Sequence, residues 1–191
     1  MELNVPSDTV SSLGRAAHDL GLGAIVGGNL FARVGMHPAV ASISDPAERG
    51  EVVNGAWRRY GTVNSLSLAA LLAGWAGARL GETRPKYLTE TERRLALVKD
   101  ASLAGLALSG VAAGLLGIKF GRSAPEGAVP LTDGDNTAEE ATAGQDRLKR
   151  RLELLSNAQL LFGAGIAISN AALSQQSFRR PPARRFFKRR Y

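Results

Sequence analysis

The chain has no cysteine among its 191 residues, and it has only two histidines, His18 and His37. The first absence excludes disulfides, thiolate metal sites and cysteine nucleophiles within the chain. The second excludes a zinc site made of three histidines from one chain. The sequence also lacks a nucleophile constellation, a phosphate-binding glycine loop and paired carboxylates in a catalytic setting. We therefore expect a non-enzymatic protein with no catalytic residues, no resident cofactor and no metal site.

Charge is absent from three long stretches of the sequence. Residues 154–178 contain no charged side chain over 25 positions, between Glu153 and Arg179. At about 1.5 Å per residue, such a helix crosses a hydrocarbon layer of about 30 Å. Residues 60–78 and 101–118 are uncharged over 19 and 18 positions. We interpret these stretches as membrane spans, and a Gly/Ala-rich soluble four-helix bundle is the alternative.

The first residues lack the basic start and apolar run of a signal peptide, so we expect the first span to direct insertion. The uncharged part of that span is only 13 residues long, from Leu20 to Ala32. Asp19 and Arg33 would then lie at opposite interfaces, with the arginine extending toward the headgroups. A buried helix of a soluble protein is the alternative for this segment.

Local signals mark where the first two helices begin and end. Ser7 or Asp8 can cap the start of the first helix. The His37-Pro38 pair should end it, because a residue before proline avoids the α region. Asp45-Pro46 then begins the second helix, with the aspartate as cap and the proline in the first turn.

Two further capping boxes begin the third and fourth helices. Thr89 with Glu92 starts the third helix, and Thr137 with Glu140 starts the fourth, which is expected over residues 138–176. The residues between these helices, 121–136, are rich in glycine, proline and acidic side chains and are expected to form a linker.

The predicted fold is therefore all-α, an integral membrane four-helix bundle in residues 1–176. The first parts of helices two and four are charged, so both helices should overhang the bilayer on one side. A basic tail, residues 177–191, follows and is expected to be disordered. The predicted spans are residues 16–36, 60–79, 100–118 and 154–176.

The distribution of basic residues predicts a multi-pass protein of the cell (plasma) membrane with both termini cytoplasmic. In that orientation the inner side holds 14 basic residues and the outer side holds ten, balanced by ten acidic residues. Basic residues favour the cytoplasmic side of a span. The basic run Arg147–Arg151, just before the last span, counts against this orientation.

Small residues recur at four-residue spacing within the predicted spans, which lets helix backbones approach closely. The pairs are Gly23/Gly27, Ala70/Gly74 and Gly110/Gly114. We expect these positions to form packing surfaces between helices rather than a dedicated dimer motif. The expected helix-packing residues are Gly23, Gly27, Gly28, Gly74, Gly110, Gly114 and Gly163.

Asparagines are the main polar residues inside the predicted spans. They are Asn29, Asn64, Asn157 and Asn170. We expect them to form hydrogen bonds between helices, and a polar pathway through the bundle centre is the alternative. No carboxylate lies deep in a span, because Asp19 and Asp100 are near span ends. Such a pattern is unlike a proton-coupled transporter.

His18 is the one candidate for binding haem or a metal ion, and an ordinary interfacial histidine is the alternative. A haem held by two histidines would need a partner across the bundle. His37 is 19 residues further along the same predicted helix. At about 1.5 Å per residue this separation is about 28 Å, too far for one haem.

The polybasic tail is expected to contact anionic lipid headgroups, because its basic residues directly follow the last span. Aromatic side chains lie between them. Nucleic acid is not expected as a partner, because no folded nucleic-acid module stands beside the tail. The expected headgroup contacts are Arg179, Arg180, Arg184, Arg185, Lys188, Arg189 and Arg190.

The stretch His18–Phe31 resembles the first helix of four-span membrane proteins similar to transmembrane protein 205 and the related copper-resistance D-type domains. That helix carries a histidine, then a Gly-Gly pair and an aromatic residue, matched here by His18, Gly27, Gly28 and Phe31. The last predicted span, with asparagine and serine among small residues, is also similar to the final span of that group. The resemblance implies the four-span fold, and its copper-type relatives suggest metal handling.

Three functions remain open from the sequence. The first is a structural or accessory subunit that packs against other membrane proteins or against itself. The second is a small transporter or channel-like protein with an asparagine-lined interior. The third is a haem or metal protein that uses His18 in an oligomer.

Overall fold

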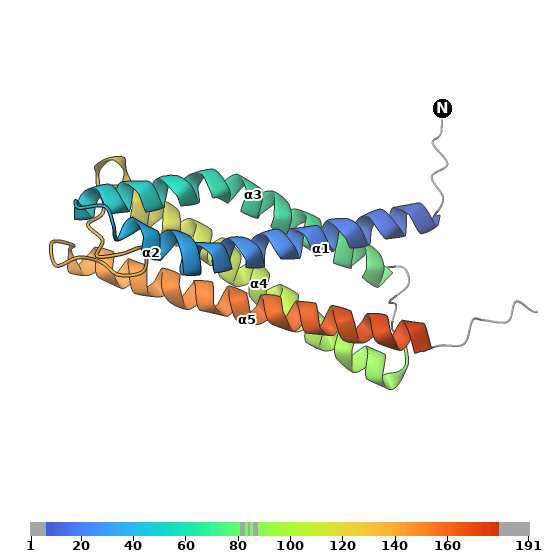
Figure 1. Ribbon diagram of the computed structural model, residues 1–191. Helices are drawn as coiled ribbons and strands as arrows, with labels where there is room; N and C mark the ends of the chain where they lie inside the picture. The colour runs from blue at the N-terminus through green and yellow to red at the C-terminus, as the bar shows by residue number, and fades with distance from the viewer. Residues whose placement is uncertain (1–6, 81–82, 84, 86–87, 180–191) are drawn as a thin grey trace, which may run out of the picture.

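The computed structural model describes residues 7–80, 83, 85 and 88–179. It is an all-helical bundle whose four long helices run up and down in chain order (Figure 1). These helices are α1 (Ser7–Phe31), α3 (Pro46–Leu80), α4 (Glu90–Gly121) and α5 (Ala143–Arg179). Among the described residues the only β pairing is an isolated bridge between Leu131 and Thr137. The predicted all-α four-helix fold is confirmed.

The first helix does not end at the His37-Pro38 pair, so that prediction is wrong. It continues as a π-helix, Ala32–Met36, and then as the short helix α2, His37–Val40. The N–H of His37 donates to the carbonyl of Ala32, five residues back. Pro38 follows with no N–H of its own. The wider π turn accommodates the proline without breaking the helix.

Two of the predicted helix starts are confirmed. The carboxylate of Asp45 accepts a hydrogen bond from the N–H of Ala47 at 2.8 Å, at the start of α3. Thr89 and Glu92 form both halves of a capping box at the start of α4. These caps satisfy backbone donors that have no partner inside the helix, so short sequence patterns suffice to place them.

The predicted start of the last helix is wrong by five residues. α5 begins at Ala143, and Thr142 and Gln145 form its capping box. The N–H of Thr142 donates to the Gln145 side chain at 2.9 Å, and the N–H of Gln145 donates to the Thr142 hydroxyl at 3.3 Å. The competing pair, Thr137 and Glu140, belongs to the folded connection before the helix.

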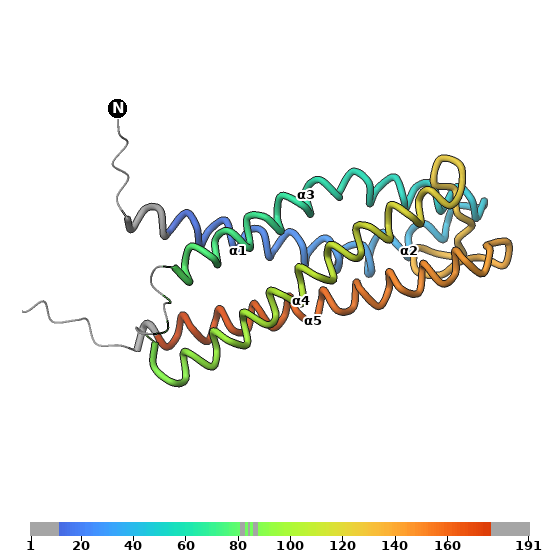
Figure 2. Tube along the Cα trace, turned by 180° about the vertical axis from the view of Figure 1, so that it is seen from behind, coloured from blue at the N-terminus to red at the C-terminus, as the bar shows by residue number. Residues whose placement is uncertain are grey.

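The two ends of the bundle differ in their connections (Figures 1 and 2). The start of α1, the end of α3, the start of α4 and the end of α5 lie at one end, called the terminal end below. The other end, called the cap end, holds α2, the start of α3, the end of α4 and the start of α5. It also holds the segment 122–142, which includes a 3-10 turn at Pro125–Gly127.

The core consists of two separate hydrophobic clusters. The bundle cluster lies between the four helices and contains Leu22, Ile25, Leu71, Trp75, Ala96, Leu103, Leu106 and Ile166. The cap cluster contains Val40, Val53, Phe120, Val129 and Leu131. Val129 and Leu131 are fully buried. The segment expected as a linker, residues 121–136, is therefore a folded part of the cap end.

Glycines hold the helices close at three of the seven expected positions. A Cβ at Gly74 would lie 2.4 Å from the carbonyl oxygen of Gly14, so α1 and α3 touch backbone to backbone. Gly28 faces the Tyr60 ring and Gly163 faces Val26, each with a Cβ at 2.4 Å. The other expected positions do not pack tightly in this chain. Gly110 has only ordinary contacts, and Gly23, Gly27 and Gly114 have no neighbouring atom within 4 Å.

Two of the four long helices meet the length and hydropathy expected of a membrane span. They are Glu90–Gly121 and, within α5, Ala143–Gln176. Among the described residues α1 and α3 do not qualify. Polar and small residues in both helices make their transfer into hydrocarbon less favourable than that of a leucine-rich helix.

Candidate functional site

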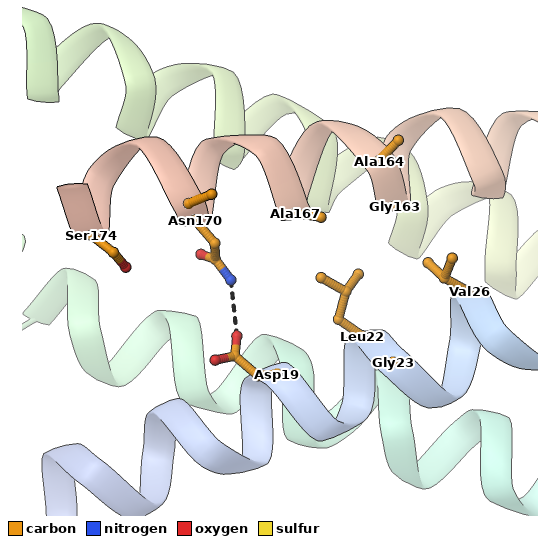
Figure 3. Close-up of a pocket in the computed structure, with 10 residues that line it drawn as sticks. Asp19, Leu22, Gly23, Val26, Gly163, Ala164, Ala167, Asn170 and Ser174 are labelled. Atoms are coloured by element: carbon orange, nitrogen blue, oxygen red, sulfur yellow. Dashed lines mark hydrogen bonds between the residues drawn. The ribbon is translucent and has the colours of Figure 1, made fainter.

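One of the four asparagines expected inside the spans, Asn170, joins charged side chains from two other helices. Its amide nitrogen donates to the carboxylate of Asp19 on α1 at 2.9 Å (Figure 3). Its amide oxygen accepts a hydrogen bond from the ammonium group of Lys99 on α4. A neutral amide on α5 therefore bridges a carboxylate and an ammonium group at the terminal end.

Trp75 brings α3, the remaining long helix, into this network. The Lys99 ammonium lies 3.9 Å from the centre of the Trp75 ring, within the range of a cation–π contact. The Trp75 indole N–H donates to the carboxylate of Asp100 at 2.6 Å, and Asp100 forms a salt bridge with Arg79 at 3.0 Å. We call the set Asp19, Trp75, Arg79, Lys99, Asp100 and Asn170 the terminal network.

Lys99 was not singled out from the sequence, and neither were Trp75 and Arg79. Only 3% of Lys99 is exposed, so its charge is held away from solvent and needs partners. The sequence signal that could have identified Lys99 was its position at the end of a predicted span. Asp19, Arg79 and the Lys99-Asp100 pair all flank predicted spans at the same interface, so helix packing brings them together.

His18 is buried beside this network, with 6.3 Å between the centres of its ring and the Trp75 ring. Its Nδ1 lies 2.8 Å from the carbonyl oxygen of Leu71 and donates to it, so Nε2 is the unprotonated nitrogen. Nε2 is buried and has no hydrogen-bond partner. Within the described part of the chain, no group of three His, Cys, Asp or Glu side chains could hold a metal ion.

The remaining asparagines do not gather at one place. Asn29 is buried, donates to the Ile25 carbonyl at 2.9 Å and accepts from Ser156 on α5 at 3.1 Å. The side-chain oxygen of Asn64 is buried without a partner. Asn157 is exposed on the outside of α5. Asn29 and Asn170 thus bond between helices, whereas Asn157 lies outside any interior pathway.

A groove of about 500 Å³ runs between α1 and α5 beside the terminal network. Asp19, Asn170 and Ser174 line one end, and Val26 and Gly163 line the other (Figure 3). Most of the remaining lining is small or aliphatic: Leu22, Gly23, Ala164, Ala167 and Ala171. The unpacked face at Gly23 therefore borders this groove.

A second polar cluster lies at the cap end around His37. Its Nδ1 donates to the Asp135 carboxylate at 2.7 Å, and the Trp57 indole N–H donates to its Nε2 at 3.4 Å. Burial lowers the pKa of His37, the nearby Lys149 lowers it further, and Asp135 partly opposes them. Lys149 is itself buried and donates to the carbonyl of Gly134, beside His37. His37 is thus a neutral, buried and hydrogen-bonded residue of the cap end.

Six of the seven expected lipid contacts of the tail are not among the residues that the structure describes. Arg180, Arg184, Arg185, Lys188, Arg189 and Arg190 lie outside the described residues. Arg179 is the last residue of α5. Headgroup contact by the tail stays a prediction.

Comparisons with known proteins found no relative of this chain. No family model matches the chain, and neither does any curated protein or solved structure. The resemblance to the transmembrane protein 205-like and copper-resistance D-type group therefore stays an expectation from two short stretches, and function has to be argued from the chain itself.

Proposed function

We propose that the chain is a small non-enzymatic, multi-pass membrane protein that acts as a structural or accessory subunit by packing against other membrane proteins. The outward faces of α4 and α5 support the membrane part. Only 22% of the apolar window of each helix is buried, whereas the core helix of a soluble protein is mostly buried. Leu108, Leu115, Leu161 and Ile168 are between 65% and 74% exposed. A bilayer would cover these side chains.

The outward face of α3 supports the packing part, and it is the observation on which the proposal chiefly rests. Five small residues recur every four positions and are all exposed: Gly61, Ser65, Ala69, Ala73 and Gly77. Gly61 and Gly77 have no neighbouring atom within 4 Å. α3 is not apolar enough to qualify as a span by itself. A helix of another subunit would cover this face better than lipid does.

Bulky substitutions on this face test the packing part. Ala69→Leu should block close approach of a partner helix, and Val111→Leu on the exposed face of α4 is the matched control. The measurement is the apparent mass of the complex extracted from native membranes in mild detergent. We expect a lower mass for the α3 variant alone. An unchanged mass for both variants, or a wild-type protein that is monomeric, would contradict the proposal.

Reporter fusions test the four-span topology and its orientation. Fusions at Glu2, Gly127 and Tyr191 should report inside, outside and inside. The alternation of the four helices places the cap end, with Gly127, opposite the start of α1 (Figure 1). An outside signal at Tyr191 would contradict either the four-span topology or the cytoplasmic termini.

A small transporter is the second candidate, and the terminal network favours it. Ionisable groups within or beside membrane spans are costly to bury and often mark a transport pathway. Asp19 and Lys99 are held by one amide next to a groove that opens sideways. A flux measurement in vesicles separates the candidates, because loss of flux in Lys99→Met with an unchanged complex mass would favour transport.

The third candidate is a haem or metal protein, and the unpartnered Nε2 of His18 is the one observation in its favour. The second ligand would have to come from another copy or subunit. The absorption spectrum and metal content of the purified complex decide it. A stoichiometric haem or copper signal that His18→Ala removes would replace the subunit proposal.

A further inference from the structure

A second groove, of about 480 Å³, lies at the cap end between the last turns of α4 and the start of α5. It is separate from the terminal network, which lies at the opposite end of the bundle (Figure 2). Its lining is half aliphatic and half polar: Leu115, Ile118, Leu148, Lys119, Arg122 and Ser123.

The two kinds of lining residue follow one another along α4. Leu115 and Ile118, 65% and 54% exposed, lie toward the middle of the bundle. Lys119 and Arg122 come next and lie one turn apart, so their side chains are neighbours on the helix surface. Both are exposed, and neither side chain forms a hydrogen bond or an ion pair with another described residue. The groove thus places two unpaired cations directly beyond an uncovered apolar surface.

The α5 side of the groove adds a basic residue. Leu148, which lines it, has Arg151 three residues further on as a neighbour on the helix surface, and this arginine is exposed. The adjacent Arg150 is already paired with Asp146 at 3.0 Å. The charge of the groove is therefore positive from both helices.

We propose that this groove binds an anionic phospholipid, with the phosphate at Lys119 and Arg122 and an acyl chain along Leu115 and Ile118. Lysine and arginine give charge-assisted hydrogen bonds to phosphate oxygens, and the two cations beside an apolar surface match the phosphate and the acyl chain of an anionic phospholipid. A free phosphate would leave the exposed leucine and isoleucine uncovered, which favours a lipid as the source. The inference rests on the proposed membrane location, because it is the bilayer that supplies the occupant.

Native mass spectrometry of the full-length protein in neutral detergent tests the site. The probes are phosphatidylglycerol and phosphatidylcholine with identical chains. The variant is Lys119→Gln with Arg122→Gln, and the control is Arg58→Gln with Arg59→Gln. The control pair is also exposed at the cap-end part of α3 and removes the same charge. Both variants keep the basic tail, so any lipid binding by the tail contributes equally to both.

We expect the wild type and the control to retain phosphatidylglycerol over phosphatidylcholine, and the groove variant to lose about tenfold of that preference. Glycerol phosphate without acyl chains should not compete. Equal preferences in the groove and control variants would overturn the site, and full competition by glycerol phosphate would show a soluble anion site instead. Failure of the membrane location would appear in the reporter fusions, which neither variant should alter.

Discussion

The two ends of the bundle are closed by different kinds of contact. At the cap end the backbone itself is in contact, since a Cβ at Gly50 would lie 1.9 Å from the carbonyl oxygen of Val129. The guanidinium group of Arg49 donates to the carbonyls of Ile43, Leu131 and Thr132, at 2.7, 3.2 and 2.9 Å. At the terminal end α1 and α3 also touch at Gly74, but the terminal network joins the helices through side chains, with one further bond from Arg79 to the Thr83 carbonyl at 2.9 Å.

This difference has a physical reason in the proposed membrane arrangement. Loop backbone needs water or other backbone groups for its hydrogen bonds, so it can build structure at the cap end, outside the hydrocarbon. Closer to the hydrocarbon only helices satisfy their own backbone, and contacts between helices depend on side chains. The packed segment of the cap end should therefore be sensitive to added volume, and the terminal network to lost polar groups.

Gly50→Ala should give the largest effect and tests the cap end. The added methyl group would overlap the Val129 carbonyl, and either the helix or the buried segment has to move. Overpacking of this kind destabilises by about 1–3 kcal/mol or more. Gly55→Ala on the same helix is the control, with open space around its Cβ. It should stabilise by up to about 1 kcal/mol through helix propensity.

Thermal unfolding in detergent, followed by circular dichroism, compares the two glycine variants. If Gly50→Ala unfolds at the wild-type temperature, the close backbone contact of the cap end is not a feature of the protein in solution. The cap end would then not be held together by close backbone contact, and the two ends would not differ in this way.

Lys99→Met should give the next effect and tests the terminal end. It preserves most of the side-chain volume but leaves the Asn170 amide oxygen without its donor. Asn170 is half-buried, and a hydrogen bond to a charged group contributes about 1.5–3 kcal/mol. Arg94→Met is the control, because its salt bridge with Glu90 is exposed and contributes at most about 0.5 kcal/mol. Denaturant unfolding that shows equal losses would mean that the terminal network adds nothing beyond a surface pair.

Acidification should destabilise the cap end through His37. Its pKa is lowered in the folded chain, so the unfolded chain binds the proton more readily. Stability is therefore complete above the ordinary pKa of 6.5 and falls as the pH drops below it. Protonated His37 also cannot accept the Trp57 N–H. The test is the free energy of unfolding between pH 5 and pH 8.

His37→Gln is the control for the pH effect, because glutamine does not titrate. The variant should be less stable than the wild type at pH 8 and should show a smaller loss on acidification. Parallel pH profiles for the two proteins would assign the acid sensitivity to other groups.

Glu126→Gly should give the smallest effect and acts on the turn of the cap. Glu126 has a φ of 55°, in the left-handed region that glycine adopts without strain. Relief of that strain, less the entropy of the added glycine, should stabilise by about 0.5 kcal/mol. Glu139→Gly, elsewhere in the same connection, should not stabilise. A lower melting temperature for Glu126→Gly would indicate that the glutamate side chain itself holds the turn.

The sequence by itself determined the parts of the structure that depend on neighbouring residues. The cap of α3 at Asp45 and the capping box of Thr89 and Glu92 follow from patterns of three or four residues, and both are present. The long uncharged stretches likewise determined that four helices form. These features arise within one or two helical turns, so no knowledge of the other helices is needed.

Only the tertiary structure decided which of several local possibilities was used. Thr137 offered a capping box as good as that of Thr142, but Leu131, six residues earlier, is fully buried in the cap cluster and fixes the chain there. Lys99 directly precedes the predicted span 100–118, and it is the centre of a network because Trp75 and Asn170 pack against it. Contacts between residues 24 and 71 positions apart depend on helix packing, which no local pattern encodes.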